Sequence, residues 1–167
     1  NILEAQVNYD ASKKMFFVND ELKRKDVTSV RESLNGYQKG QCFYCYRPIS
    51  IFPDSPNFCD VDHVYPHKIK KYLKSQVNID GAWNLVLSCE DCNRGKNGKF
   101  DNLAHKKYIE RLFKRNEYLI ISHNPLKETL QKQTGQKNKD RLAFYQRMDN
   151  EALNLLPTKN RWTCNEE

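Results

Sequence analysis

The sequence lacks any long hydrophobic run. Its uninterrupted apolar stretches, such as Met15–Val18 and Tyr118–Ile121, are only about one helical turn long. A membrane-spanning helix needs about 18–20 consecutive apolar residues. The opening residues also lack the apolar core of a signal peptide. We therefore expect no membrane-spanning helix and a location in the prokaryotic cytoplasm.

Internal repeats, low-complexity tracts and Gly/Ser linkers are also missing. A chain of 167 residues with 38% hydrophobic and 11% aromatic residues can bury a core, which excludes global disorder. The chain begins at Asn1 instead of Met, which indicates an excerpt of a longer protein or a processed chain. We expect a helical lead-in over 1–41, a core over 42–100 and a basic helical region over 101–167.

Four of the six cysteines occur in two C-x-x-C pairs, Cys42 with Cys45 and Cys89 with Cys92. Without a secretory signal, such cysteines indicate metal or redox chemistry more than a disulfide framework. Four thiolates are the number that a tetrahedral structural zinc site uses. The sequence therefore predicts a structural Zn²⁺ on these cysteines, with an inserted element between the two pairs.

Positive charge is concentrated in the second half of a chain whose net charge is +7 and whose pI is about 9.1. Residues 93–147 carry fourteen Lys and Arg against five Asp and Glu. Such a basic half is expected for a protein that binds a polyanion. The alternative is that these lysines and arginines only solvate helix faces.

Local patterns predict a mixed α+β fold that is mainly helical. Two short strands flank a long basic loop over 65–83, and a short helix follows the second cysteine pair. Three prolines make 47–57 a loop, and Gly135 ends the helix that Asn124 and Pro125 begin. The strands are expected at 58–64 and 84–89, and the longer helices at 20–37, 102–117, 125–134 and 142–155.

Between and beside the cysteine pairs, the chain resembles the HNH endonuclease family in its cysteine-bearing branch. The resemblance is carried by C42-x-x-C45, V61-D62-H63-V64-Y65-P66 and W83-N84-L85-V86-L87-S88-C89-x-x-C92-N93-x-x-K96. It covers roughly a third of the chain. It implies a ββα-metal finger, in which two strands and a helix surround one divalent ion. It also implies metal-dependent hydrolysis of duplex DNA to 5′-phosphate and 3′-hydroxyl ends.

Phosphodiester hydrolysis requires a deprotonated water and stabilisation of the leaving oxygen. An imidazole, with an unperturbed pKa of about 6.5, suits the base, and this assigns His63. The resemblance places catalytic Mg²⁺ or Mn²⁺ between the carboxylate of Asp62 and the side-chain oxygen of Asn93. Asn93 replaces the final His of the family name, and its neutral amide binds metal more weakly than a carboxylate. Asn84 is expected to brace the loop that presents His63.

Cations beside the motif are expected to contact DNA phosphates without reading sequence. They are Arg94, Lys96, Lys99 and Lys68. His67 is a further candidate ligand for metal or phosphate, or an ordinary solvated loop histidine. Consecutive strand residues point to opposite faces, so Asp62 and His63 can act on one phosphate only if the strand ends or bulges there. We therefore expect irregular backbone at Asp62–Val64.

Two other functions remain open. The first is a catalytically silent, zinc-stabilised module that binds nucleic acid, which four cysteines also suit. The second is a nuclease that acts on RNA or single strands instead of duplex DNA. Asp62 and His63 favour the nuclease, because a zinc ion closed by four thiolates needs neither an acid nor an imidazole. We expect the nuclease domain of a larger restriction or antiviral defence protein, with an additional domain or partner subunit.

Overall fold

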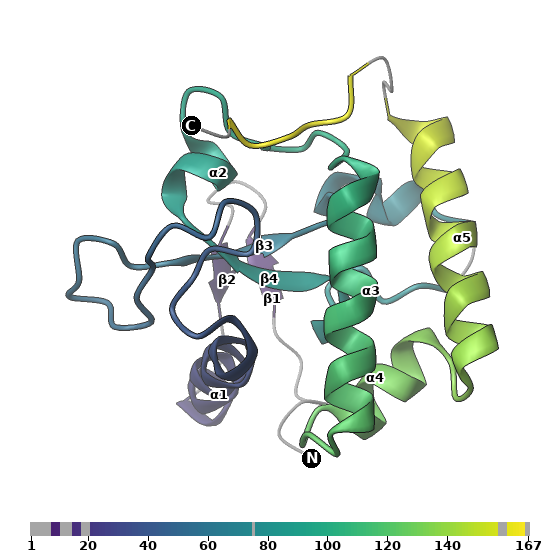
Figure 1. Cartoon of the computed structure of the whole chain (residues 1–167), viewed down its shortest axis with the longest axis horizontal. Helices are drawn as coiled ribbons and strands as arrows, with labels where there is room; N and C mark the ends of the chain where they lie inside the picture. Colours follow the sequence, from purple (N-terminus) through teal and green to yellow (C-terminus); the bar gives the residue numbers. More distant parts are fainter. Residues whose placement is uncertain (1–7, 11–14, 18–20, 75, 157–159, 166–167) are drawn as a thin grey trace. The chain divides into compact units, whose positions relative to one another are not determined.

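The computed structural model describes residues 8–10, 15–17, 21–74, 76–156 and 160–165 (Figure 1). The chain forms two compact units that alternate along the sequence. Unit 1 comprises Asn1–Asp62, Leu85–Phe100 and Cys164–Glu167, and unit 2 comprises His63–Asn84 and Asp101–Thr163. The division falls inside the region 42–100 that the sequence led us to expect as one core.

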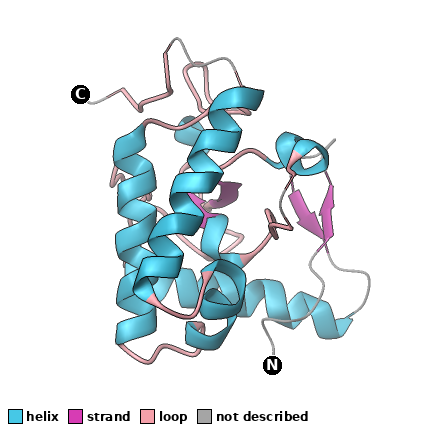
Figure 2. Ribbon diagram, turned by 90° about the vertical axis from the view of Figure 1, so that its right-hand side faces the viewer, coloured by secondary structure: helices cyan, strands magenta, loops and turns pink. Residues whose placement is uncertain are grey.

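Among the described residues the strands are short and form two two-stranded sheets, drawn in magenta in Figure 2. In the first, β1 (Asn8–Asp10) pairs antiparallel with β2 (Met15–Phe17). In the second, β3 (Asp60–His63) pairs with β4 (Leu85–Ser88). The second sheet matches the expected strand pair, whereas the β1–β2 pair was not expected from the sequence.

The described part of the chain is mixed α+β and mainly helical. Unit 1 contains α1 (Glu21–Gln38) and the five-residue α2 (Glu90–Arg94). Unit 2 contains two 3₁₀ helices, η2 (His67–Tyr72) and η3 (Ala82–Asn84), in the region expected to be a loop. It also contains the three long helices α3 (Lys106–Ile121), α4 (Lys127–Thr134) and α5 (Asn138–Leu155).

Most helix ends agree with the sequence to within a few residues. Gly135 ends α4 with φ of +138°, a conformation that favours glycine, and its N–H bonds the carbonyl of Gln131. The short helix expected after the second cysteine pair instead begins inside it, because the sulfur of Cys89 accepts from the N–H of Cys92 and caps α2. The expected start of α1 at Asp20 lies outside the described residues.

Unit 2 has an aromatic core that holds the 3₁₀ helix η3. Trp83 is fully buried, with Phe144 and Tyr145 of α5 packed edge-on to its ring at 4.9 and 5.8 Å between centroids. The carbonyl of Trp83 accepts from Arg115 Nη2 at 3.2 Å and from Asn116 Nδ2 at 2.9 Å. These contacts from α3 and α5 fix the backbone that leads directly into Asn84.

None of the helices in the described part of the chain combines the length and the apolarity that a membrane span requires.

Candidate functional site

The four expected zinc ligands lie together in unit 1. Their sulfur atoms are all within 4.8 Å of one another, and the Sγ atoms of Cys45 and Cys89 are 3.7 Å apart. Zn–S bonds of about 2.3 Å arranged as a tetrahedron place the sulfurs about 3.8 Å apart. The cluster formed by Cys42, Cys45, Cys89 and Cys92 therefore has the dimensions of a zinc site and can bind a structural zinc ion.

The local backbone turns each cysteine pair toward the cluster. The N–H of Tyr46 bonds the carbonyl of Cys42 at 3.0 Å, and Tyr46 has φ of +63°. Backbone N–H groups also point at sulfur, from Cys89 to Cys42 Sγ at 3.3 Å and from Cys92 to Cys89 Sγ at 3.4 Å. N–H groups directed at sulfur favour thiolates over thiols.

The thiols of this cluster need a cation to ionise together. Hydrogen bonds from Cys89 and Cys92 lower the pKa of Cys42 far below its ordinary value. The hydrogen bond with Cys42 in turn raises the pKa of Cys89 to about 12. The hydrogen bond between Cys42 and Cys92 raises the pKa of Cys92 even further. A bound dication would favour the thiolate form of its ligands and so allow these neighbouring thiols to lose their protons together.

Asp62, also in unit 1, is buried and already has two partners. Its Oδ2 accepts from the hydroxyl of Tyr44 at 2.6 Å and lies 3.4 Å from Nζ of Lys99. Burial and the charge of Asp62 raise the pKa of Tyr44 well above its ordinary value, so this hydroxyl stays protonated and donates. Lys99 is fully buried, so it serves as the counter-ion of Asp62.

This position of Lys99 differs from the surface contact with phosphate that the sequence led us to expect. Its Nζ also bonds the carbonyl of Phe100 at 3.3 Å. The exposed cations beside the motif are Lys68 and Lys96, together with Arg94, whose guanidinium is half exposed and bonds Asp60 at 2.9 Å. Only these three of the four expected phosphate contacts remain at the surface.

The basic stretch 93–147 also offers fewer free cations than its composition implies. Arg115 is fully buried against backbone carbonyls of unit 2. Arg141 is buried too, with Nε and Nη2 each 2.9 Å from a carboxylate oxygen of Glu117. These arginines hold α3, α4 and α5 in place, and their charge is not available to a polyanion.

Asn93 is buried in unit 1, and its amide has one defined contact. Nδ2 donates to Oδ2 of Asp60 at 2.9 Å. The amide oxygen is therefore the atom of this side chain that could bind a cation. Carboxylate and amide oxygens fit the preference of Mg²⁺ and Mn²⁺, but the Lys99 ammonium already neutralises Asp62 and weakens the attraction for a further cation.

The backbone at Asp62 and His63 is more regular than expected. Strand β3 continues through His63, and a bend begins only at Val64. The irregularity predicted over Asp62–Val64 is therefore confined to its last residue. Asp62 and His63 are consecutive but belong to different units; the hydrogen bond between Tyr44 and Asp62 lies in unit 1, and the one between His63 and Asp80 lies in unit 2.

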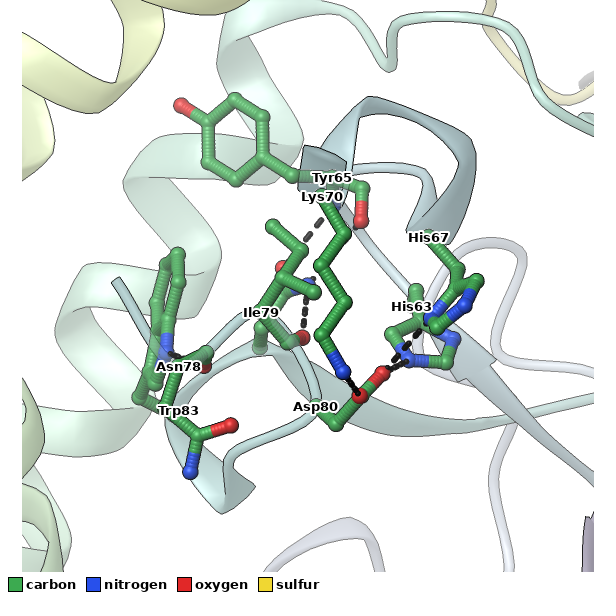
Figure 3. Close-up of polar contacts among 9 residues, drawn as sticks. His63, Tyr65, His67, Lys70, Asn78, Ile79, Asp80 and Trp83 are labelled. Atoms are coloured by element: carbon green, nitrogen blue, oxygen red, sulfur yellow. Dashed lines mark hydrogen bonds and ion pairs between the residues drawn. The ribbon is translucent and has the colours of Figure 1, made fainter. Parts of the chain in front are cut away.

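In unit 2, His63 is held by an acid that sequence reasoning missed. Nε2 of His63 lies 2.7 Å from Oδ1 of Asp80, and the side chains are 5% and 13% exposed (Figure 3). Burial alone would raise the pKa of Asp80, but hydrogen bonds from His63, Lys70 and His67 outweigh it and hold this pKa below its ordinary value. Asp80 is therefore ionised, and an ionised carboxylate only accepts. His63 donates through Nε2, which in the neutral ring leaves the lone pair on Nδ1.

Two residues of η2 complete the environment of Asp80. Nδ1 of His67 lies 2.8 Å from the same Oδ1, and Nζ of Lys70 lies 2.7 Å from Oδ2 (Figure 3). Residues three apart in a 3₁₀ helix lie on one face, which is why His67 and Lys70 both reach Asp80. We name His63, His67, Lys70 and Asp80 the imidazole cluster.

Asn84 braces the chain on both sides of this cluster, as expected from the sequence. It is fully buried, and its Oδ1 accepts from the N–H of Tyr65 at 2.8 Å. Its Nδ2 donates to the carbonyls of Tyr65 at 3.0 Å and Ile79 at 2.9 Å. One side chain thus ties the residues that follow His63 to the residue that precedes Asp80.

Replacing Asn84 by alanine is expected to destabilise the protein by about 3 kcal/mol. The variant leaves three buried backbone groups without partners, at about 1–3 kcal/mol each before relaxation. Urea denaturation would show this as a lower midpoint with an unchanged slope. Asn150→Ala, at an exposed position on α5, is the matched control and should stay within about 0.5 kcal/mol. Equal midpoints for the two variants would contradict the bracing role.

One sequence signal could have found Asp80. It is the only acidic residue between His63 and Asn84, in a segment that carries four lysines. A single acid among so many cations is a natural counter-ion for an imidazole, but the contact joins residues 17 positions apart, and it depends on the fold.

Comparison with models of known protein families, with curated proteins and with solved structures found no match.

Proposed function

We propose that this chain is a metal-dependent nuclease of the HNH type that hydrolyses phosphodiester bonds in duplex DNA. The observation that carries the proposal is the contact between His63 Nε2 and the ionised carboxylate of Asp80. An acid that receives the N–H of an imidazole fixes the tautomer and orientation of that ring, as in catalytic triads. The acid also stabilises the positive charge that the ring acquires when it takes a proton.

The reaction that this pair supports starts with a water molecule. Nδ1 of His63 takes a proton from the water, whose oxygen attacks phosphorus while the bond from phosphorus to the 3′ oxygen breaks. The departing oxygen is protonated from solvent, which gives a 5′-phosphate and a 3′-hydroxyl. Positioned general bases contribute about 10²–10⁴-fold to such rates.

Asp62 and Asn93 would hold the hard cation that such nucleases use. Because Tyr44 and Lys99 both contact Oδ2 of Asp62, the ligands would be Oδ1 of Asp62 and the amide oxygen of Asn93. Mg²⁺ or Mn²⁺ would there neutralise phosphate charge and stabilise the leaving oxygen. The nearby Lys99 leads us to expect weak cation affinity in the absence of DNA.

The remaining parts of the proposal concern the finger and its DNA. Strands β3 and β4 and helix α2 supply the two strands and the helix of a ββα-metal finger, and the cysteine cluster supplies a zinc ion that stabilises it. The exposed side chains of Arg94, Lys96 and Lys68 are the proposed phosphate contacts. Such contacts strengthen binding without selecting a sequence.

A second candidate function is a silent, zinc-stabilised module that binds nucleic acid. The buried pairing of Lys99 with Asp62 favours it, because an acid with an internal counter-ion needs no metal. This alternative gives no role to the contact between His63 and Asp80, which is why we prefer the nuclease.

Nicking of supercoiled plasmid tests the proposal. The wild-type protein is expected to nick the plasmid with Mg²⁺ or Mn²⁺ and not with EDTA, and His63→Ala is expected to lose this activity. His105→Asn is the matched control: it removes an imidazole remote from the motif but keeps an acceptor for the N–H of Lys107 at the start of α3.

All three proteins are first checked for zinc content and far-UV circular dichroism. His63→Gln serves as a second variant should the alanine disturb the buried site. Duplex, single-stranded and RNA substrates compared at equal concentration identify the substrate. Salt-sensitive DNA binding without nicking in any metal would refute the nuclease and support the silent module.

A further inference from the structure

We propose that His63, His67 and Asp80 form a second metal site, selective for divalent transition ions such as Zn²⁺, Co²⁺ and Ni²⁺. The site lies wholly within unit 2. It shares no ligand with the cysteine cluster of unit 1 or with the oxygen pair proposed for Mg²⁺.

The three ligand atoms already converge. His63 Nε2 and His67 Nδ1 lie 2.7 and 2.8 Å from Oδ1 of Asp80, and all three residues offer ligand atoms within 4.8 Å of one another. Zinc bonds of about 2.0–2.2 Å require ligand atoms about 3.3–3.5 Å apart in a tetrahedron. Each hydrogen-bonded pair therefore has to open by about 0.5–0.8 Å, which small side-chain rotations provide.

The donor set determines which ions bind. Two imidazoles and one carboxylate suit Zn²⁺, Co²⁺ and Ni²⁺, whereas Mg²⁺ prefers oxygen ligands alone. Three protein ligands leave a fourth position for water. A neutral ring that binds through the nitrogen facing Asp80 carries its proton on the other ring nitrogen, so this proton moves by exchange with water and none is released.

The surroundings provide an outer partner and a route of entry. Lys70 donates to Oδ2 of Asp80, the oxygen that need not bind the ion, as expected for a carboxylate ligand oriented by an outer hydrogen bond. The side chains of His67 and Lys70 are 22% and 53% exposed, so an ion can enter from their side. Lys70 can also swing into water if its charge opposes the ion.

Binding at this site would regulate the nuclease, and this consequence rests on the proposed function. An ion on Nε2 of His63 forces the ring proton onto Nδ1, the nitrogen proposed to accept a proton from water. It also takes the carboxylate of Asp80 away from the ring. Zn²⁺, Co²⁺ or Ni²⁺ beyond the first equivalent is therefore expected to inhibit Mg²⁺-dependent nicking.

Metal counting tests the site without reference to activity. The full chain, with zinc on its cysteines, is dialysed to equilibrium against micromolar free Zn²⁺, and the bound metal is measured. The wild type and His105→Asn are expected to hold one more zinc ion per chain than His67→Ala and Asp80→Ala. Co²⁺ added to the zinc-loaded wild type should give visible d–d bands without a thiolate charge-transfer band.

Two results would overturn the site: a wild-type protein that holds only the cysteine-bound zinc, or a His67→Ala variant that keeps the second ion. His67→Ala changes a side chain that is 22% exposed and less buried than Asp80, so it tests the site even if Asp80→Ala fails to fold. Full nicking activity at saturating second metal would refute the regulation alone. A wild-type protein that never nicks would refute the proposed function, while the metal count would still decide the site.

Discussion

Cys92→Ser is expected to lose its zinc and, with it, the fold of unit 1. Structural zinc contributes an apparent free energy of about 10–16 kcal/mol in zinc-finger peptides at pH 7, and this energy is coupled to folding. Whole domains are stable by only about 5–15 kcal/mol. Cys92 is a buried residue of the five-residue helix α2, which is too short to persist without the ion. Serine removes one thiolate and leaves an incomplete site.

Metal analysis and amide NMR spectra would measure this loss. Resonances of Leu85–Phe100 should collapse toward unfolded positions in Cys92→Ser, and also in the wild type treated with a strong chelator. Cys59→Ala is the matched control, because Cys59 is buried in unit 1 but outside the cluster, and burial raises the pKa of its thiol. The control should retain its zinc and a dispersed spectrum. A dispersed, zinc-loaded Cys92→Ser would contradict the role of the cluster.

The features that the sequence predicted well depend on spacing over short distances. Two C-x-x-C pairs place thiolates at the edges of a tetrahedron whatever lies between them, and the structure brings all four sulfurs together. The apolar period of α3 and α5 and the glycine that ends α4 are local signals of the same kind. The bracing role of Asn84 had a different source: the resemblance to the HNH family implied it, and the hydrogen bonds of its amide to Tyr65 agree with it.

Contacts between distant residues could not be predicted in this way. Lys99 looked like one more surface lysine, and only the tertiary fold shows that it is buried as the counter-ion of Asp62. The partners of Arg115 and Arg141 are likewise fixed by the packing of helices, so the count of positive charges overstated the basic surface. Charge composition gives the number of cations, whereas burial decides which of them can meet a partner.

The division of the chain into two units could not be predicted from the sequence either. Strand β3 contains both Asp62 and His63, yet the boundary between the units falls between these two residues. The β1–β2 pair was missed for a different reason: strands of three residues are too short to show an alternating pattern.

Asp80→Asn is expected to reduce nicking by about 10²–10⁴-fold while DNA affinity stays nearly constant. Asparagine keeps the size of the side chain but removes its charge. The amide can present Nδ2 to His63, which would favour the wrong tautomer, and it cannot stabilise an imidazolium. Single-turnover nicking rates and equilibrium DNA binding would separate the two effects. An equal loss of binding and rate would contradict a role through His63.

Combining this variant with His63→Ala gives the sharper test. Asp80 has no catalytic function once the ring is gone if it acts only by orienting the ring of His63 and stabilising its positive charge. Adding Asp80→Asn to His63→Ala should then not lower the nicking rate further. Independent contributions would instead multiply, and the double variant would be slower by the product of the two factors. Lys70→Met controls for general disturbance of the imidazole cluster, because it removes the exposed contact to Oδ2 and leaves the bond from His63 to Oδ1 in place. If the nicking rate of the double variant is lower by the product of the two factors, Asp80 acts by a route other than His63. If Lys70→Met loses as much rate as Asp80→Asn, the effect belongs to the imidazole cluster as a whole.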